Sequence, residues 1–453
     1  MTLDSVLDRD VVREIAWIDP LAAYASLRGN GPSIWFDSAA GGRWSYVLAE
    51  PVASLTSEAD ATDDPFTALS AMLHAQHGTI DAPPPFAGGV AGFLSYELRR
   101  WIERDALRHP ADADLPEAQL DLYDTVLAFD VEARRTWLIA RSFPASRESA
   151  AKRADRWQAR LAQPSAVPTG VPTATWHADW QQDEYQAHVA ALRQRTFDGE
   201  IYQANFTQRF IATRPAGLDP LAAYCRLREL APAPFATLIE LGDGRALASA
   251  SPERYLRVES NRRVITEPIK GTRPRGRDAA QDDALAQELL RDEKERAENL
   301  MIVDLLRNDL GRVAQKGSVV VEDLFAVERF AAVQHLVSRV AATLAPGRDL
   351  VDLLRAAFPG GSITGCPKVH AMRAIDDSER ARRGAYCGSI AWFGSDGTMD
   401  SSIAIRTLTF GCDRVLAQAG GGIVADSDPA SEYRECLLKA RPLLRTLDPS
   451  WAL

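Results

Sequence analysis

The chain has 453 residues, 46% of them hydrophobic, which is enough to bury the core of one large body or of two or three ordinary domains. Its formal net charge is −10 and it contains no long basic run, so binding to a nucleic-acid backbone or to an anionic membrane is disfavoured. An anionic substrate must therefore be met by local positive groups or by a metal ion.

Cysteine usage and the N-terminus indicate the compartment. The cysteines are scattered, with no CxxC pair and no nearby pair of histidines, which argues against a disulfide framework and against a structural zinc site. The first fifteen residues are charged where a signal peptide needs an apolar stretch, and no apolar run approaches the roughly 20 residues that cross a bilayer. We expect a cytoplasmic protein with no membrane association.

In chain order, the pattern predicts two regions and a connector. Residues 1–162 form an N-terminal region that mixes strand-like runs with a helical stretch at 145–162. Residues 163–175 contain three prolines, a glycine and no charged residue up to Thr173, and are predicted to be a linker. Residues 176–448 alternate helices and strands and form the second region.

A single lysine stands in a segment bounded by proline and glycine at 268–272. Pro268 and Gly271 on either side of Lys270 predict a turn that aims the amine, which would suit a nucleophile. The alternative is an ordinary solvated lysine in a turn, and the segment alone does not decide between them.

The second region carries three helical patterns, at 179–197, at 279–309 and after Asp428-Pro429. An N-cap acid followed by proline at the first helical position is a helix start signal. The apolar spacing supports the other two patterns.

Two of these helices carry paired carboxylates. Glu295 and Glu298 share one helical face, and Glu432, Glu435 and Lys439 share another. Two acidic pairs suggest a hard cation such as Mg²⁺, which takes one or two carboxylates plus water and substrate oxygens. A solvated helix face with ordinary salt bridges is the simpler explanation of each pair alone, and spacing cannot bring the two helices together.

Two glycine-rich segments offer backbone N–H groups to an anion. Residues 358–368 run from a loop into a helix, and residues 419–423 follow a strand, forming a predicted loop in which the backbone can approach a ligand. A tight structural turn is the alternative for both. His335 lies in an apolar, strand-like run, where a buried structural histidine is the alternative to a catalytic one.

Taken together, the motifs resemble those of the chorismate-utilising enzymes. This family includes anthranilate synthase component I, aminodeoxychorismate synthase component I, isochorismate synthases and salicylate synthases. The resemblance covers about 176–447, and residues 86–98 resemble the anthranilate and aminodeoxychorismate branch. The segments that carry it are 249–254, 268–275, 296–309, 358–368, 400–407 and 419–424.

The resemblance implies an α+β fold of the anthranilate synthase component I type. Large twisted antiparallel sheets would form a sandwich with flanking helices. Residues 1–162 would be the N-terminal anthranilate synthase component I-like region, and residues 176–448 the chorismate-binding catalytic domain.

The resemblance also implies a magnesium site and a substrate site. Glu298 and Glu435 would be the principal Mg²⁺ ligands with Glu295 and Glu432 close by, and the ring carboxylate of chorismate would sit on the metal. Arg406 and the backbone of the glycine segment would hold the second carboxylate, because an arginine fork suits that group. The residues implied to bind the substrate are His335, Thr364, Gly365, Arg406, Gly420, Gly421, Gly422 and Lys439.

Two positions favour one branch of the family. Anthranilate and isochorismate synthases carry alanine where this chain has Lys270, and a lysine there marks aminodeoxychorismate synthase. Isochorismate and salicylate synthases use another lysine to activate water, and Gln203 stands at the matching position. The resemblance implies that neutral Lys270 attacks C2 of chorismate while Glu253 protonates the departing 4-hydroxyl. Ammonia would then expel the lysine and give 4-amino-4-deoxychorismate, for folate (4-aminobenzoate) biosynthesis.

The resemblance implies partners as well. No glutamine amidotransferase segment is evident, so a separate amidotransferase subunit would form a heterodimer with this chain and supply ammonia. The N-terminal region would hold a tryptophan pocket around residues 36–38 and 43–45. Two alternatives remain: anthranilate synthase component I, disfavoured by Lys270, and a catalytically silent subunit that senses tryptophan or scaffolds a complex, disfavoured by the intact set of site residues.

Overall fold

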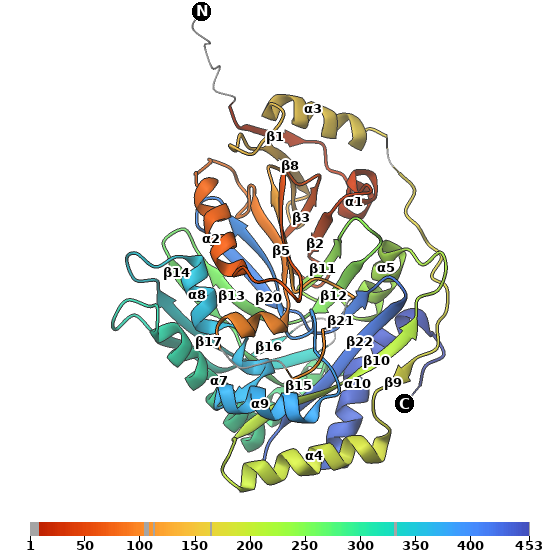
Figure 1. Ribbon diagram of the computed structural model, residues 1–453, viewed down its shortest axis with the longest axis vertical. Coiled ribbons are helices and arrows are strands. Elements are labelled where there is room, and N and C mark those ends of the chain that lie inside the picture. The colour runs from red at the N-terminus through yellow and green to blue at the C-terminus, as the bar shows by residue number, and fades with distance from the viewer. Residues whose placement is uncertain (1–8, 104–107, 112–113, 164, 330–332, 453) are drawn as a thin grey trace, which may run out of the picture.

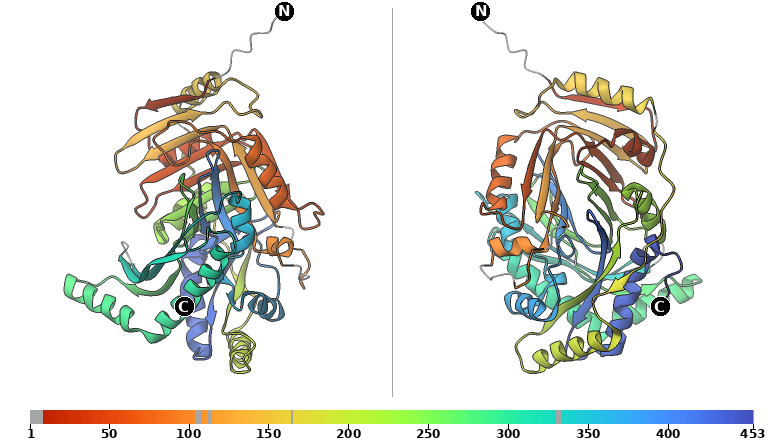
Figure 2. Two further views of the ribbon diagram at one scale, coloured as in Figure 1. Left: turned by 90° about the vertical axis from the view of Figure 1, so that its left-hand side faces the viewer. Right: turned by 45° about the vertical axis from the view of Figure 1, so that its right-hand side comes forward.

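Two large antiparallel sheets face each other, and helices cover their outer surfaces (Figure 1). This computed structural model describes residues 9–103, 108–111, 114–163, 165–329 and 333–452. In the turned views the N-terminal strands lie at one end of the molecule, and α4 and α10 lie at the other (Figure 2). The predicted α+β sandwich is confirmed.

The first sheet has twelve strands and is assembled from both halves of the chain. All of its ladders are antiparallel, and β9 (His177–Ala178) joins it as a short edge partner of β10. Its spatial order is β1 (Val11–Ile15), β8 (Arg135–Ala140), β7 (Thr125–Asp130), β3 (Trp44–Ala49), β2 (Ser33–Asp37), β11 (Phe235–Glu240), β12 (Ala246–Ser251), β21 (Thr407–Phe410), β22 (Arg414–Ile423), β10 (Gln203–Thr213) and β18 (Gly365–Cys366).

The second sheet has ten strands and is also shared by both halves. β16 (Val320–Arg329) joins it by pairing with β17. The spatial order of the other strands is β15 (Ile269–Pro274), β17 (Val333–Thr343), β14 (Arg263–Thr266), β13 (Arg254–Val258), β20 (Met399–Ile403), β19 (Ser389–Gly394), β5 (Gly89–Leu94), β6 (Ala118–Tyr123) and β4 (Ala53–Ser57). The N-terminal region and the second region therefore contribute strands to the same two sheets.

Several helices begin at an Asp-Pro pair. In α1 (Pro20–Leu27), α2 (Pro65–Ala75), α5 (Pro220–Leu230) and α10 (Pro429–Leu447), the aspartate side chain accepts from a backbone N–H of the first turn and proline occupies the first helical position. The start predicted at Asp428 is confirmed, and the same signal marks the three other helices. The remaining helices are α3 (Ala150–Leu161), α4 (Gln182–Phe197), α6 (Ala279–Arg291), α7 (Glu293–Gly311), α8 (Leu350–Ala357), α9 (Lys368–Ser378) and the 3₁₀ turns η1 (Tyr96–Trp101) and η2 (Gly361–Ile363).

The prediction of one continuous helix at 279–309 is wrong, because the helix is interrupted at Asp292, between α6 and α7. This residue has an extended backbone, with ψ 107°, and its side chain accepts from Glu295 N as the N-cap of α7. An aspartate competes well for this role because its short carboxylate reaches the unpaired N–H groups of a helix start. The break lets α7 begin at the site described below.

Apolar packing occupies three layers. One cluster lies between the two sheets and includes Ile34 of β2, Phe93 of β5 and Ile390 of β19. The others lie between each sheet and its outer helices, for example Leu443 of α10 on the first sheet and Leu353 of α8 on the second. In the part of the chain that the structure describes, no helix is both long and apolar enough to cross a membrane.

Candidate active site

A cavity of ≈ 510 Å³ lies where β15 and β17 of one sheet and β10 and β22 of the other approach α7 and α10. These elements gather in the lower half of Figure 1. The cavity brings together most of the predicted site residues from segments far apart in the sequence. Those that line it are Glu253, Lys270, Glu295, Glu298, His335, Arg406, Gly420, Gly422, Glu432, Glu435 and Lys439.

Lys270 reaches the cavity from a strand rather than from the predicted turn. It lies in β15, and the pairing of β15 with β17 shifts register between Lys270 and Thr272. Gly271, at this irregularity, has φ 68°, a conformation that strongly favours glycine. The Lys270 Nζ atom lies 3.8 Å from Glu298 Oε2, and 14% of its side chain is exposed. The bulge thus aims the amine into the cavity.

Glu253 faces the same cavity from the segment between β12 and β13, with 7% of the residue exposed. Burial raises the pKa of its carboxyl, against the opposing effects of a hydrogen bond from Ser362 and the charge of Lys270. A carboxyl with a raised pKa keeps its proton at higher pH, as a general acid requires.

Four carboxylates from two helices line the same cavity. The helical spacing predicted each pair, but it could not show that the two helices meet. Glu295 and Glu298 come from α7, and Glu432 and Glu435 come from α10. Lysines lie among them: Lys439 Nζ is 2.6 Å from Glu435 Oε1, and Lys294 Nζ is 3.5 Å from Glu432 Oε1 and 3.9 Å from Glu298 Oε1.

The negative charges of these acids lie close together, and this crowding affects the pKa values of their carboxyl groups. Burial and the neighbouring Glu298 raise the pKa of Glu295, and burial, together with Glu435, raises the pKa of Glu432. Burial opposes ionisation of Glu435, but Lys439 and Lys294 hold the pKa of its carboxyl below the usual value. A divalent cation would relieve this repulsion.

The carboxylates of α7 and α10 that line the cavity are oxygen donors, the type that Mg²⁺ prefers. Among the described residues, no three acidic, histidine or cysteine side chains form a cage of their own. Mg²⁺ does not need one, because it keeps several waters and accepts one or two carboxylates plus substrate oxygens. Gly421 leaves room at the acids: a Cβ there would lie 3.1 Å from Glu432 Oε2 and 3.7 Å from Glu435 Oε1.

Arg406 offers a positive charge to an anion. Burial lowers the pKa of its guanidinium, which makes no hydrogen bond to another side chain of the described residues. Its backbone has φ 52°, which is uncommon for a residue with a Cβ. A partly buried guanidinium of this kind is suited to a carboxylate ligand.

The three glycines lie in a strand, so the loop predicted at 419–423 is wrong. Gly420, Gly421 and Gly422 belong to β22 and pair with Thr207, Phe206 and Asn205 of β10. On its other side β22 pairs with β21 at residues 415–417, before the glycines begin, and Gly420 and Gly422 line the cavity. A Cβ at Gly420 would lie 1.9 Å from Phe206 O, so only glycine permits this close pairing.

His335 lies on β17 with 8% of the residue exposed. Its Nδ1 is 3.0 Å from Thr272 Oγ1, and burial lowers the pKa of the imidazole, with a further lowering by Arg406. The ring is therefore neutral near pH 7 and contacts the cavity beside Lys270.

The segment 361–365 presents different residues to the cavity from those named by the resemblance. Ser362 and Ile363 line it, whereas Thr364 is fully buried and its hydroxyl donates to Gly360 O. Gly365 pairs with Ala204 at the start of β10. A role for Thr364 and Gly365 at the substrate ring stays a prediction.

Some cavity residues have no signal in the sequence motifs. Asn205, Tyr386 and Gln418 line the cavity because β10, the segment before β19, and β22 carry them there. Lys294 could have been found from its i,i+4 spacing to Glu298. Arg273 also lines the cavity and forms ion pairs with Glu288 and Asp292.

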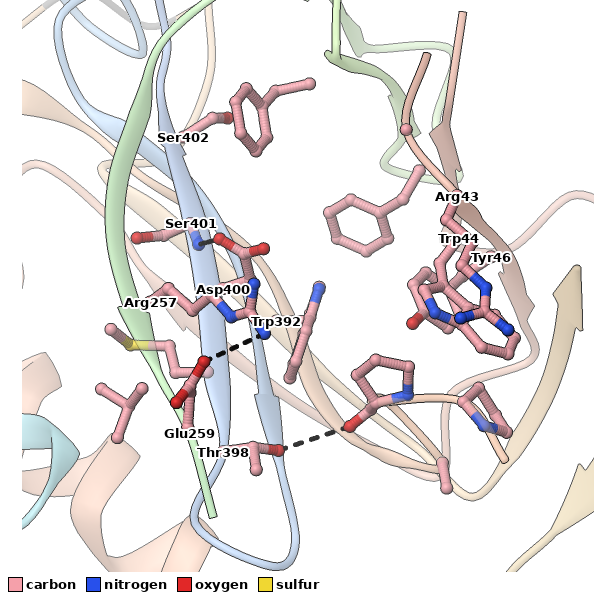
Figure 3. Close-up of a pocket in the computed structure, with 18 of the residues that line it drawn as sticks. Arg43, Trp44, Tyr46, Arg257, Glu259, Trp392, Thr398, Asp400, Ser401 and Ser402 are labelled. Carbon is pink, nitrogen blue, oxygen red and sulfur yellow. Dashed lines mark hydrogen bonds and ion pairs between the residues drawn. The ribbon is translucent and has the colours of Figure 1, made fainter. Parts of the chain in front are cut away.

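A second cavity of ≈ 760 Å³ lies between the two sheets. Figure 3 shows Arg43, Trp44 and Tyr46 on one side of it and Trp392 and Asp400 on the other. The predicted tryptophan segments reach this cavity through residues 36–38 and 43–44. It has an aromatic wall and carries charges of both signs.

Comparison with known proteins places this geometry in a family. The model of the chorismate binding enzymes matches residues 31–445. The aminodeoxychorismate synthase component 1 of Klebsiella aerogenes is 41% identical over 90% of both chains, and the anthranilate synthase component 1 of Streptomyces coelicolor is 40% identical over 94% of this chain and 86% of that one. The crystal structure of anthranilate synthase component I from Streptococcus pneumoniae TIGR4 superposes with a TM-score of 0.80 at 30% identity, covering 94% of this chain and 98% of that one.

Proposed function

Because the chain belongs to the family of chorismate binding enzymes, we propose that it aminates chorismate to 4-amino-4-deoxychorismate. The observation that carries the proposal is the position of the Lys270 amine, which points into the cavity beside the carboxylates of α7 and α10. The relatives named aminodeoxychorismate synthase and those named anthranilate synthase are about equally similar, so the choice between the two products rests on this lysine.

The cavity suits a dicarboxylate with a ring between its charges. Arg406 supplies a partly buried guanidinium for one carboxylate, and the edge of β22 at Gly420 and Gly422 lines the same cavity. At the acidic wall formed by α7 and α10, a cation would meet the second carboxylate. Bound Mg²⁺ would neutralise that carboxylate, and Glu298 and Glu435, with Glu295 and Glu432 behind them, are the residues that would hold the metal.

In the proposed reaction Lys270 is the nucleophile, and Glu253 acts first as the acid and then as the base. The neutral amine of Lys270 forms a bond to C2 of the ring, the double bonds shift, and the C4–oxygen bond breaks while Glu253 gives its proton to the leaving hydroxyl, which departs as water. Ammonia then forms a bond to C4, the electrons return, and the bond from C2 to Lys270 breaks. The Glu253 carboxylate takes the proton that the new C4 ammonium group loses, which restores the acid for the next turnover.

Ammonia would come from a separate glutamine amidotransferase subunit, as the component 1 names of the relatives suggest for those proteins. In the folate route, a further enzyme would convert the product to 4-aminobenzoate. The second cavity is where we propose that tryptophan would bind, between Trp44 and Trp392.

The test of the proposed product is its mass. The chain is incubated with chorismate, Mg²⁺ and ammonium, and we expect 4-amino-4-deoxychorismate, which keeps the enolpyruvyl arm. Anthranilate, which is fluorescent and forms with release of pyruvate, would refute the assignment and establish the alternative. An absence of turnover even with an amidotransferase partner would support a silent subunit.

The magnesium site has its own test in Glu435→Gln. The substitution removes one negative charge that faces the metal, so we expect the Mg²⁺ concentration for half-maximal activity to rise at least about 10-fold. The same rise should appear in the Mg²⁺-induced increase of the melting temperature, which does not require turnover.

Glu293→Gln is the matched control, since Glu293 is an exposed acid on the first turn of α7 and does not line the cavity. An unchanged magnesium requirement in Glu435→Gln, or an equal change in Glu293→Gln, would contradict the ligand assignment.

A further inference from the structure

Arg383 and Glu379 form a buried ion pair directly behind the catalytic cavity. Arg383 Nη2 lies 2.6 Å from Glu379 Oε1 and Nε lies 2.9 Å from Oε2, with 2% and 7% of the two side chains exposed. Neither residue lines the cavity. The pair therefore does not touch the proposed substrate, and any role in the reaction must pass through other residues.

The guanidinium binds two walls of the cavity at once. Nη1 donates to Ile363 O at 2.9 Å and Nη2 donates to Asn205 O at 2.5 Å. Ile363 and Asn205 both line the cavity, one from η2 and the other from β10. The backbone carbonyl of Arg383 also accepts from Gln418 Nε2 at 3.2 Å, which ties in a third lining residue on β22.

Glu379 fixes the orientation of the arginine. Its Oε1 accepts from Thr207 N at 3.1 Å and from Thr207 Oγ1 at 2.8 Å, so the carboxylate is itself anchored on β10. On the other side, the ring of Tyr96 lies 4.7 Å from the guanidinium, and Arg383 N donates to Glu97 Oε1 at 2.9 Å. Each nitrogen of the guanidinium thus donates a hydrogen bond, and these bonds together hold the group in one orientation.

The arrangement is specific to arginine. A planar guanidinium presents five N–H donors in a rigid fork, which allows a bidentate carboxylate and two carbonyl oxygens to be bound together, whereas lysine is a point charge with three rotatable donors. Burying such a pair is a poor source of stability, because desolvation offsets most of the attraction between the charges. Because the pair lies between two walls of the cavity, it is suited to holding those walls in place.

We propose that Arg383, oriented by Glu379, is a positioning residue that fixes the separation of the β10 and η2 walls around the substrate ring. The proposal rests on the proposed function, because the ring is that of chorismate. The hydrogen bonds from Arg383 to Ile363 O and Asn205 O thus act as a clamp between the two walls. Loss of the clamp moves the walls, while the side chains that contact the substrate are still present. A displacement of about 1 Å at a reacting centre can lower a rate by on the order of 10²-fold.

The test is Arg383→Lys, which keeps the charge and loses the fork. We expect kcat to fall roughly 100-fold and the KM for chorismate to rise about 10-fold, because both the reaction geometry and the fit of the ring are disturbed. A smaller folded fraction lowers the apparent kcat but leaves KM unchanged, so KM separates positioning from folding.

Arg153→Lys is the control, since Arg153 and Asp124 form an equally buried pair with 4% and 2% of their side chains exposed, and neither residue lines either cavity. Equal kcat and KM in Arg383→Lys and wild type, or equal changes in the two variants, would overturn the proposal. If Arg383→Lys does not fold, the proposal is tested with Thr207→Val instead. This substitution removes one hydrogen bond to Glu379 and leaves the ion pair intact. A several-fold rise in its KM for chorismate supports the clamp, and an unchanged KM overturns it.

These outcomes are separate from the identity of the product. If the wild-type enzyme makes anthranilate, the proposed function fails, but the same constants are measured on chorismate consumption and the clamp is still tested. If no product forms, chorismate affinity is measured from the chorismate-induced shift in melting temperature, with a 10-fold weaker affinity expected for Arg383→Lys.

Discussion

Replacing Lys270 with alanine is expected to lower the rate of chorismate amination on the order of 10³-fold or more. The substitution removes the amine that forms the covalent bond to C2, and no other lysine of the cavity lies on β15. Intact-mass measurement of wild-type protein incubated with chorismate and Mg²⁺ without ammonium is expected to show an adduct of one substrate molecule minus water. The alanine variant is expected to show none.

Lys270→Arg separates the nucleophile from its charge. Arginine keeps a positive charge near Glu298 but is effectively always protonated and cannot attack C2. We expect Lys270→Arg to be as inactive as Lys270→Ala and equally free of adduct. Activity retained in the arginine variant would mean that Lys270 acts only by its charge, and an unchanged rate in the alanine variant would remove it from the reaction.

Glu253→Gln is expected to lower kcat by about 10²- to 10⁴-fold, the range typical for loss of a general acid. Glutamine has nearly the same shape but has no proton to give to the leaving hydroxyl. The pH profile should change too. Because burial raises the pKa of Glu253, the carboxyl keeps its proton above the usual range, and the fraction able to donate falls as the pH rises through that pKa. This dependence should disappear in Glu253→Gln.

Glu253→Asp is the companion variant. It keeps a carboxylic acid in the same buried place but shortens it, so we expect a slower enzyme whose rate still falls as the pH rises through the pKa of the acid. A glutamine variant with the wild-type pH profile would exclude Glu253 as the proton donor. The two variants together distinguish loss of the acid from a general disturbance of the cavity.

The helix signals show how far local sequence reaches. Asp428-Pro429 fixed the start of α10 because an aspartate side chain and a proline ring act within one turn. The spacing of Glu432 and Glu435 then placed both on one face. The same local logic missed Asp292, where an acid within an apparently continuous helical pattern caps a new helix instead. Competing local hydrogen bonds of this kind cannot be ranked from the pattern alone.

The glycine segment shows the opposite case. Three consecutive glycines predict a loop because glycine is disfavoured in a strand interior, yet Gly420 to Gly422 belong to β22. The reason lies in another strand: Phe206 O of β10 comes so close to Gly420 that a side chain is excluded. A contact across more than two hundred residues is not visible in the local sequence.

Local sequence sets the residue types of the site and their local presentation: an acid pair on one face of each of two helices, a lysine next to a glycine, and an Asp-Pro helix start. The packing of the whole fold selects which of these groups share a cavity. It brought α7 and α10 together, buried Glu253 beside Lys270, and set Arg383 behind Asn205 and Ile363. Helical periodicity and capping act over a few residues, whereas these juxtapositions depend on two sheets built from both halves of the chain, which only the folded packing defines.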